Sequence, residues 1–185
     1  MPGFGDPEAK ILIVGLAPGF HGANRTGRPF TGDGAGILLY KTLYKMGWGS
    51  IAEVTSRDDG LNLKHVYISN IVKCVPPKNI PNGQEKENCS PYLFQELDYL
   101  KKVNTILALG AVAHNEILRN LKNKKIISSL KNYPFKHGAI YSFDNWKYRL
   151  ANSYHPSTYN VNTGVLTEEM FMDVFKQIEK DHFPD

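Results

Sequence analysis

The chain has 185 residues, of which 42% are hydrophobic and 22% are charged, and its formal net charge is +4 at pH 7. This composition is typical of one globular domain with an ordinary core, and it excludes a low-complexity or largely disordered protein. No apolar run reaches the ~20 residues of a membrane span, and the first ten residues lack the pattern of a signal peptide. We therefore expect a single domain over residues 1–185, in the cytoplasm and without membrane attachment.

The first half of the chain contains two strand patterns, each followed by an unusual loop. Residues 10–17 form a short apolar run typical of a buried parallel strand. The loop GLAPGFHGANRTGRPFTGDGAG follows, with seven glycines, and leads into an amphipathic helix expected over residues 36–47. Residues 65–72, rich in β-branched side chains, predict a second strand that ends in a proline-rich segment.

The second half of the chain alternates helix and strand patterns. Ser90 is expected to cap a helix over residues 91–102, with Pro91 at its first position. The remaining elements, in chain order, are a strand over 105–110, a helix over 110–122, a hairpin within 137–154 and a last helix that starts after Thr167. This alternation predicts an α/β fold whose mainly parallel sheet is covered on both faces.

Several polar residues follow the strand ends of this expected sheet. Ligands bind at the carboxyl ends of the strands in such folds. The glycine-rich loop, Asn70, Gly110 and His155 all leave those ends, so we expect them to meet on one rim of the sheet.

A nucleotide cofactor explains the glycine-rich loop poorly. No Gly-Lys-Ser/Thr follows, and the spacing of Gly15, Gly19 and Gly22 does not match the dinucleotide-binding fingerprint. Nor does the next strand end in an acidic residue that could hold a ribose. A nucleotide-handling domain unrelated to DNA therefore stays as a minor alternative.

The chain has two cysteines, Cys74 and Cys89. A secreted disulfide scaffold would need a denser set. Composition leaves open a pair of thiols, one disulfide or half of a metal site.

Three segments, in order, resemble the uracil-DNA glycosylase superfamily, and within it family 5. They are the glycine-rich loop, YISNIVKCVPPKN with NCSPYL, and SYHPSTYNVNTGVLT. The resemblance covers essentially the whole chain. Family 4 is similar but carries Glu where Leu16 stands, and it lacks the GANRTGR insert.

The resemblance implies a three-layer α/β/α fold with a central, mainly parallel four-stranded sheet. It implies a monofunctional glycosylase that flips a nucleotide out of uracil-containing DNA and hydrolyses the N-glycosidic bond, the first step of base excision repair. Tolerance of other deaminated bases such as hypoxanthine is implied as well, and we expect a monomer. The alternative is a non-catalytic or cluster-deficient protein that only binds uracil-DNA.

Four side chains correspond to the family's reacting groups. Phe30 is similar to the aromatic ring on which the flipped base stacks, and Asn70 resembles the residue that reads the base edge. His155 corresponds to the residue that faces uracil O2 and stabilises the leaving anion. Asp33 is the candidate to orient water or stabilise the sugar cation. The competing structural roles are a core position for Phe30, a loop-backbone bond for Asn70 and a turn cap for Asp33.

Small residues of the loop correspond to the base-binding wall. Gly15 and Gly19 would let backbone approach the flipped base, and Gly19 stands where another branch of the superfamily carries a bulky ring that rejects the thymine methyl. Ala17 replaces the water-orienting aspartate of that branch. The residues expected at the DNA backbone are Arg25, Arg28, Ser157 and Tyr159, the last as a possible wedge.

The resemblance also implies a [4Fe-4S] cluster, with Cys74 and Cys89 as two of its four ligands. The other two cysteines belong to an N-terminal segment of the family that this chain lacks. We therefore expect a missing N-terminal segment, and an incomplete or absent cluster in the chain as given.

Overall fold

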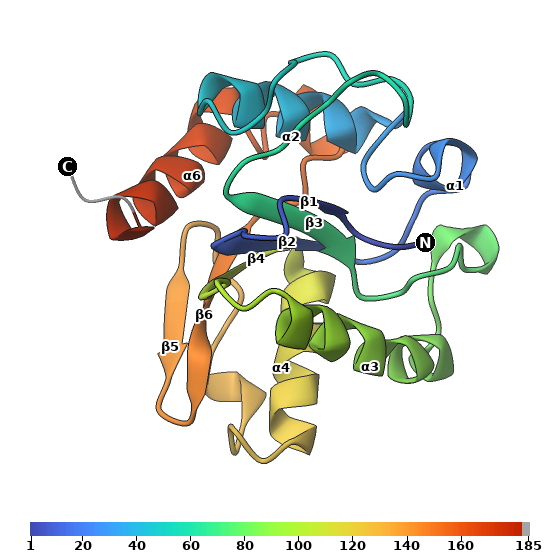
Figure 1. Ribbon diagram of the computed structural model, residues 1–185. Coiled ribbons are helices and arrows are strands. Elements are labelled where there is room, and N and C mark those ends of the chain that lie inside the picture. The colour runs from blue at the N-terminus through green and yellow to red at the C-terminus, as the bar shows by residue number, and fades with distance from the viewer. Residues whose placement is uncertain (183–185) are drawn as a thin grey trace.

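The computed structural model describes residues 1–182, which form one six-stranded sheet in the order β1-β3-β2-β4-β6-β5 (Figure 1). Four adjacent strands are parallel to one another, and the two outermost strands pair antiparallel to their neighbours. The parallel strands are β2 (Ile11–Gly15), β3 (Val66–Asn70), β4 (Thr105–Leu109) and β6 (Trp146–Ser153), and the edge strands are β1 (Phe4–Gly5) and β5 (Ile140–Phe143).

The α/β class is confirmed, and the expected four-stranded sheet is the parallel centre of a larger one. β5 and β6 form the hairpin expected within residues 137–154. β1 was not predicted, because two residues are too short to show the alternation of a strand.

Helices cover both faces of the sheet and make the molecule three-layered (Figure 1). α2 (Gly34–Lys45) and α6 (Glu168–His182) lie on one face, and α3 (Gly83–Tyr99) and α4 (Ala111–Asn123) lie on the other. Successive residues of β2 point to opposite faces, so that Ile11 and Ile13 enter one core and Leu12 and Val14 the other. Within residues 1–182, no helix is both long and apolar enough to cross a membrane.

The predicted start of α3 was wrong by eight residues. The helix begins after Asn82, whose side chain accepts a hydrogen bond from the Glu85 N–H at 2.9 Å, while the Glu85 carboxylate accepts one from the Asn82 N–H at 2.8 Å. This reciprocal capping box satisfies two donors that the helix itself leaves open. Ser90 instead bonds the side chain of Asn120, and Pro91 lies inside the helix.

Four short helices lie in the connections and were not predicted. They are α1 (Ala23–Thr26), η1 (Pro77–Asn79), η2 (Leu130–Asn132) and α5 (Thr158–Asn162). Three of them, α1, η1 and α5, follow β2, β3 and β6 respectively, so they build the rim at the carboxyl ends of these strands.

Candidate active site

A cavity of about 290 Å³ opens at the carboxyl ends of β2, β3 and β6. Most of the residues predicted for the active site line it. The complete lining is Leu16, Ala17, Gly19, Ala23, Phe30, Asp33, Gly34, Ala35, Asn70, His155, Ser157 and Thr158. Three of the four segments expected at the rim therefore meet in one cavity, whereas Gly110 does not line it and lies next to His155 instead.

Asn70, the last residue of β3, projects a carboxamide with no partner into this cavity. The residue is only 4% exposed. Among residues 1–182 its side chain has no hydrogen-bond partner, which removes the alternative of a bond to the loop backbone. The amide atoms are not sealed off, because the cavity gives them access to solvent. Such an amide is available for a ligand that presents both a donor and an acceptor.

Phe30 forms another wall of the cavity and holds an unusual backbone conformation. Its φ is +53°, which aromatic residues rarely adopt, and the residue is 7% exposed. The backbone is fixed by close packing against the first turn of α2, since a Cβ at Gly36 would lie 1.7 Å from the Phe30 carbonyl oxygen. Strain of this kind is concentrated at functional sites, because the surrounding structure must enforce it.

Gly15 is the residue that lets Phe30 and Asn70 meet. A Cβ at this position would lie 2.5 Å from Asn70 Oδ1 and 2.6 Å from Phe30 Cζ, both too close for any real contact. Although Gly15 does not line the cavity itself, it supports two of its walls from behind.

His155 faces Phe30 across the cavity, with the ring centroids 6.2 Å apart. Burial lowers the pKa of His155 below its ordinary value of 6.5, and the negative charge of Asp33 opposes part of this shift. The imidazole is therefore neutral at neutral pH. Asn160 Nδ2 donates a hydrogen bond to the His155 carbonyl at 2.8 Å. Gly110 packs closely against His155, since a Cβ added at Gly110 would lie 3.2 Å from the His155 Cβ.

Asp33 both caps a helix and lines the cavity. It is the N-cap of α2, with Oδ1 accepting the Gly36 N–H at 3.0 Å. The residue also lines the cavity, and its Oδ2 faces the loop, where a Cβ at Gly22 would lie 2.6 Å from it. The cap holds the carboxylate in place and leaves its second oxygen without a hydrogen-bond partner in the described chain.

The remaining small residues shape the cavity. Ala17 and Gly19 both line it, and a Cβ at Gly19 would approach nothing closer than Asp33 Oδ2 at 3.9 Å. Thr158, at the first position of α5, also lines the cavity. Its place directly after His-Pro-Ser predicts a position beside the DNA but does not by itself indicate that it reaches the base-binding cavity.

Three of the four residues predicted to contact DNA lie at accessible positions. Arg25 is exposed and its Nε donates to the His21 carbonyl at 2.9 Å, and Tyr159 is 73% exposed. Ser157 caps α5, its hydroxyl accepting the Asn160 N–H at 3.3 Å.

Arg28 contradicts the prediction that it reaches a DNA phosphate. It is 2% exposed, and its guanidinium donates to both carboxylate oxygens of Asp59, at 2.9 and 2.6 Å. Its Cζ also lies 5.0 Å from the centroid of the Phe4 ring. Burial alone would raise the pKa of Asp59, but hydrogen bonds from Arg28 and three backbone N–H groups lower it to about 2. Arg28 is thus a structural residue that ties the loop to the segment around Asp59.

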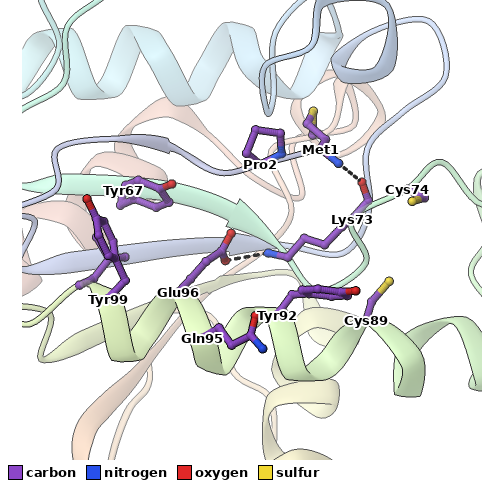
Figure 2. A pocket seen from close by; sticks show the side chains of 11 residues that line it. Met1, Pro2, Tyr67, Lys73, Cys74, Cys89, Tyr92, Gln95, Glu96 and Tyr99 are labelled. Atoms are coloured by element: carbon purple, nitrogen blue, oxygen red, sulfur yellow. Dashed lines mark hydrogen bonds and ion pairs between the residues drawn. The ribbon is translucent and has the colours of Figure 1, made fainter.

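Cys74 and Cys89 line a separate cavity of about 480 Å³ between β3, α3 and the N-terminus (Figure 2). Both thiols are free, and Lys73 Nζ forms an ion pair with Glu96 at 2.7 Å inside this cavity. A four-iron cluster needs four thiolate ligands. Residues 1–182 offer these two thiols and no group of three or more residues able to hold a metal, so the residues present do not fit a complete cluster.

Comparison with known proteins agrees with this geometry. The family model of the uracil DNA glycosylase superfamily matches residues 2–179. The type-5 uracil-DNA glycosylase of Thermus thermophilus is 44% identical over 97% of this chain and 79% of its own length, and that of Pyrobaculum aerophilum is 40% identical over 98% and 76%. The type-4 uracil-DNA glycosylase of Sulfurisphaera tokodaii is 33% identical over 94% and 72%.

A solved structure is similar in fold. The crystal structure of Pedobacter heparinus SMUG2 aligns with a TM-score of 0.54 over 94% of this chain and 76% of its own, at 13% identity. The likeness at this identity concerns the fold alone. The family match and the identities to its type-5 members show that the chain belongs to the uracil-DNA glycosylase superfamily.

Proposed function

We propose that this protein hydrolyses the N-glycosidic bond between uracil and deoxyribose in DNA, the first step of base excision repair. The observation that carries the proposal is the unpartnered Asn70 carboxamide, buried in a cavity whose other walls are Phe30 and His155. The type-5 uracil-DNA glycosylases to which the chain is similar support the same reaction.

Recognition of uracil follows from the chemistry of the Asn70 amide. Its Nδ2 can donate to uracil O4 while its Oδ1 accepts from N3–H. Cytosine presents the reversed pattern and would leave buried groups unpaired, at about 1–3 kcal/mol each. Phe30 supplies the face on which the extruded base stacks.

His155 and Asp33 act on the breaking bond. As this bond breaks, its electron pair leaves with the base, and the neutral His155 imidazole donates a hydrogen bond to O2, where negative charge develops. Water attacks C1′ and passes its proton to the Asp33 carboxylate. Ala17 has no polar group for this task, so Asp33 is the acidic side chain that the cavity lining offers for it.

Substrate range and DNA contacts extend the proposal. The open space beside Gly19 admits bases other than uracil, hypoxanthine among them. Arg25, Ser157 and Tyr159 contact the DNA strand around the flipped nucleotide. We infer that the protein acts as a monomer in the cytoplasm.

Cys74 and Cys89 are the two thiols of this chain that a [4Fe-4S] cluster would use. A complete cluster then needs two ligands from outside this sequence, and no step of the proposed reaction passes through it. Elemental analysis of the purified chain should find less than four iron atoms per monomer. A full complement in a monomer would contradict this.

The test is release of free uracil from a DNA oligonucleotide with one uracil. The parent protein should release uracil and leave an alkali-labile site, whereas His155→Ala should lower the rate of the chemical step more than it weakens binding. Asn70→Asp should reduce the preference for uracil over cytosine. No release by the parent, with enzyme in excess, would overturn the proposal.

The second candidate is a protein that binds uracil-DNA without turnover, favoured by Ala17 and by the incomplete ligand set. It predicts a retarded band with uracil-DNA and no alkali-labile site. The same oligonucleotide therefore separates the two functions.

A further inference from the structure

A further cavity, of about 490 Å³ and distinct from the one lined by Cys74 and Cys89, adjoins the cavity that holds Asn70 and His155. We call the cavity with Asn70 and His155 the active cavity and the adjoining one the second cavity. It lies between the loop after β2 and the segment after β3, the two regions that approach each other at α1 and η1 (Figure 1). Its lining is Phe20, His21, Asn24, Val75, Pro76, Pro77, Lys78 and Asn79.

The two cavities share one wall. Gly19 and Ala23 line the active cavity, whereas their immediate neighbours Phe20 and Asn24 line the second one. The Asn24 N–H also donates to the Gly19 carbonyl at 3.0 Å, which closes this turn of backbone on itself. A linear polymer with one unit in the active cavity therefore has to cross only this turn for its next unit to enter the second cavity.

An aromatic ring stands open in the second cavity. Phe20 is 57% exposed, and it meets His21 edge to face, with the centroids 5.1 Å apart at 87°. Its backbone N–H donates to Asn79 Oδ1 at 3.1 Å, which ties the two walls together. The ring is thus held on a fixed backbone with much of its surface available for stacking.

The cavity and its surroundings carry positive charge. Lys78 lines it, and the exposed Arg25 follows Asn24 directly. No carboxylate lines the cavity, and within residues 1–182 neither cation forms an ion pair. An aromatic platform beside unpaired cations is the combination that binds single-stranded nucleic acid.

We propose that this second cavity binds the nucleotide next to the flipped one on the same DNA strand. Phe20 stacks on its base, and Lys78 faces its phosphate. This inference rests on the proposed function, because the flipped nucleotide fixes where its neighbour lies. Continuity with the active cavity favours DNA over a free nucleotide or a protein partner.

The stacking contact can be tested with single-stranded oligonucleotides that carry one non-cleavable uracil nucleotide. Two ligands are compared for each side of the uracil, one with a normal neighbouring base and one with an abasic linker there. On the side whose nucleotide enters the second cavity, the parent should bind the ligand with the normal base at least about fivefold more tightly than the ligand with the abasic linker, as expected for base–aromatic stacking. Phe20→Ala should remove this difference, and Phe20→Trp should restore it.

The matched control is Tyr44→Ala, because Tyr44 is 49% exposed on α2 and lines neither cavity. It should leave the difference between the two ligands unchanged. Phe20→Leu, with urea unfolding of every variant, keeps the test valid if the alanine variant is unstable.

The charge contact predicts a separate result. Lys78→Gln should reduce the slope of log Kd against log salt concentration by about 0.7, the value for one phosphate of single-stranded DNA. Lys131→Gln on η2 is the control and should leave the slope unchanged.

The outcomes separate this inference from the proposed function. If the parent releases uracil but Phe20→Ala still distinguishes the two ligands as the parent does, the second binding site is wrong and the function stands. If the parent releases no uracil, the function itself fails. Tight binding of a free mononucleotide that Phe20→Ala abolishes, without any effect of the neighbouring base, would assign the cavity to another ligand.

Discussion

Gly15, the last residue of β2, and Gly19, in the loop that follows, are four residues apart, yet the structure gives them opposite tolerance for a side chain. A methyl group at Gly15 would collide with Asn70 and Phe30, whereas one at Gly19 meets only Asp33 Oδ2 at ordinary contact distance.

Gly15→Ala should therefore displace both base-binding side chains and lower kcat/KM for uracil excision by about a hundredfold, equivalent to about 3 kcal/mol. Gly19→Ala should lower it less than about fivefold. Single-turnover kinetics on one oligonucleotide measures both variants, and equal losses would contradict the geometry.

Arg28 provides a second prediction at the residue scale. Arg28→Ala removes two charge-assisted hydrogen bonds to Asp59, which keeps three backbone N–H donors, so it should lower the free energy of unfolding by about 2–3 kcal/mol. Urea unfolding measures this loss.

Arg25→Ala is the comparison for Arg28. This exposed residue should leave stability within about 0.5 kcal/mol and instead reduce the salt dependence of DNA binding. If Arg28→Ala is as stable as the parent but binds DNA more weakly, the structural role of Arg28 is wrong and the phosphate contact is the better explanation.

The placement of residues around the cavity was predictable to different degrees. Asn70 and His155 could be expected at one rim, because they follow strands of a parallel sheet. The burial of Arg28 could not be predicted, because its partner Asp59 lies in an irregular segment without periodicity. An arginine in a glycine-rich loop looks the same in sequence whether it faces solvent or a distant carboxylate.

At the scale of elements, α2 begins with a residue that serves the helix and the cavity together. Asparagine caps a helix as well as aspartate does. Asp33→Asn should therefore keep the stability of the protein while lowering the rate of uracil release, whereas Asp33→Ala should also lose about 1 kcal/mol of unfolding free energy. Unfolding and single-turnover measurements on the two variants separate the roles. Full activity of Asp33→Asn would remove Asp33 from the reaction.

The same substitution should change the titration of His155. Asp33 raises the pKa of His155 against the larger, opposite effect of burial. Without the charge in Asp33→Asn, the midpoint should move further below 6.5. Imidazole signals in an NMR titration measure this shift, and an upward shift would contradict the arrangement.

α3 shows which elements the sequence could predict. The pattern of alternating helices and strands was visible, and Asn82 with Glu85 is a capping box in the sequence. Pro91 misdirected the boundary, since proline is usual in a first turn and rare within a helix. The very short elements β1, α1 and η1 carry no periodic pattern, so only long-range packing determines whether these residues form a strand or a helix.

The whole molecule should lose stability in mild acid. Burial, the nearby positive charge of Arg149 and, more weakly, Lys10 lower the pKa of His182 from 6.5 to about 4, although Asp181 opposes this. The unfolded chain therefore takes up protons first as the pH falls, and the stability present at pH 7 is lost between about pH 6.5 and 4. Since His182 is only half-buried, we expect a loss of about 1–2 kcal/mol.

His182→Gln tests this pH dependence, because glutamine can keep the bond to Thr105 Oγ1 without titrating. Urea unfolding at pH 7 and pH 4.5 should show a smaller difference for the variant than for the parent. The lowered pKa values of His137 and His155 leave some dependence in both proteins. An unchanged difference would exclude His182 as its source.

The two edges of the sheet affect how the molecule behaves at high concentration. A long, flat edge strand exposes unpaired backbone groups and invites pairing with a second chain. Here one edge strand, β1, has two residues, and the other, β5, has a register shift between Tyr141 and Phe143 that interrupts its ladder. Both edges are therefore poor templates for intermolecular β-pairing, so the parallel centre of the sheet is protected from aggregation by strands that contribute little to the site.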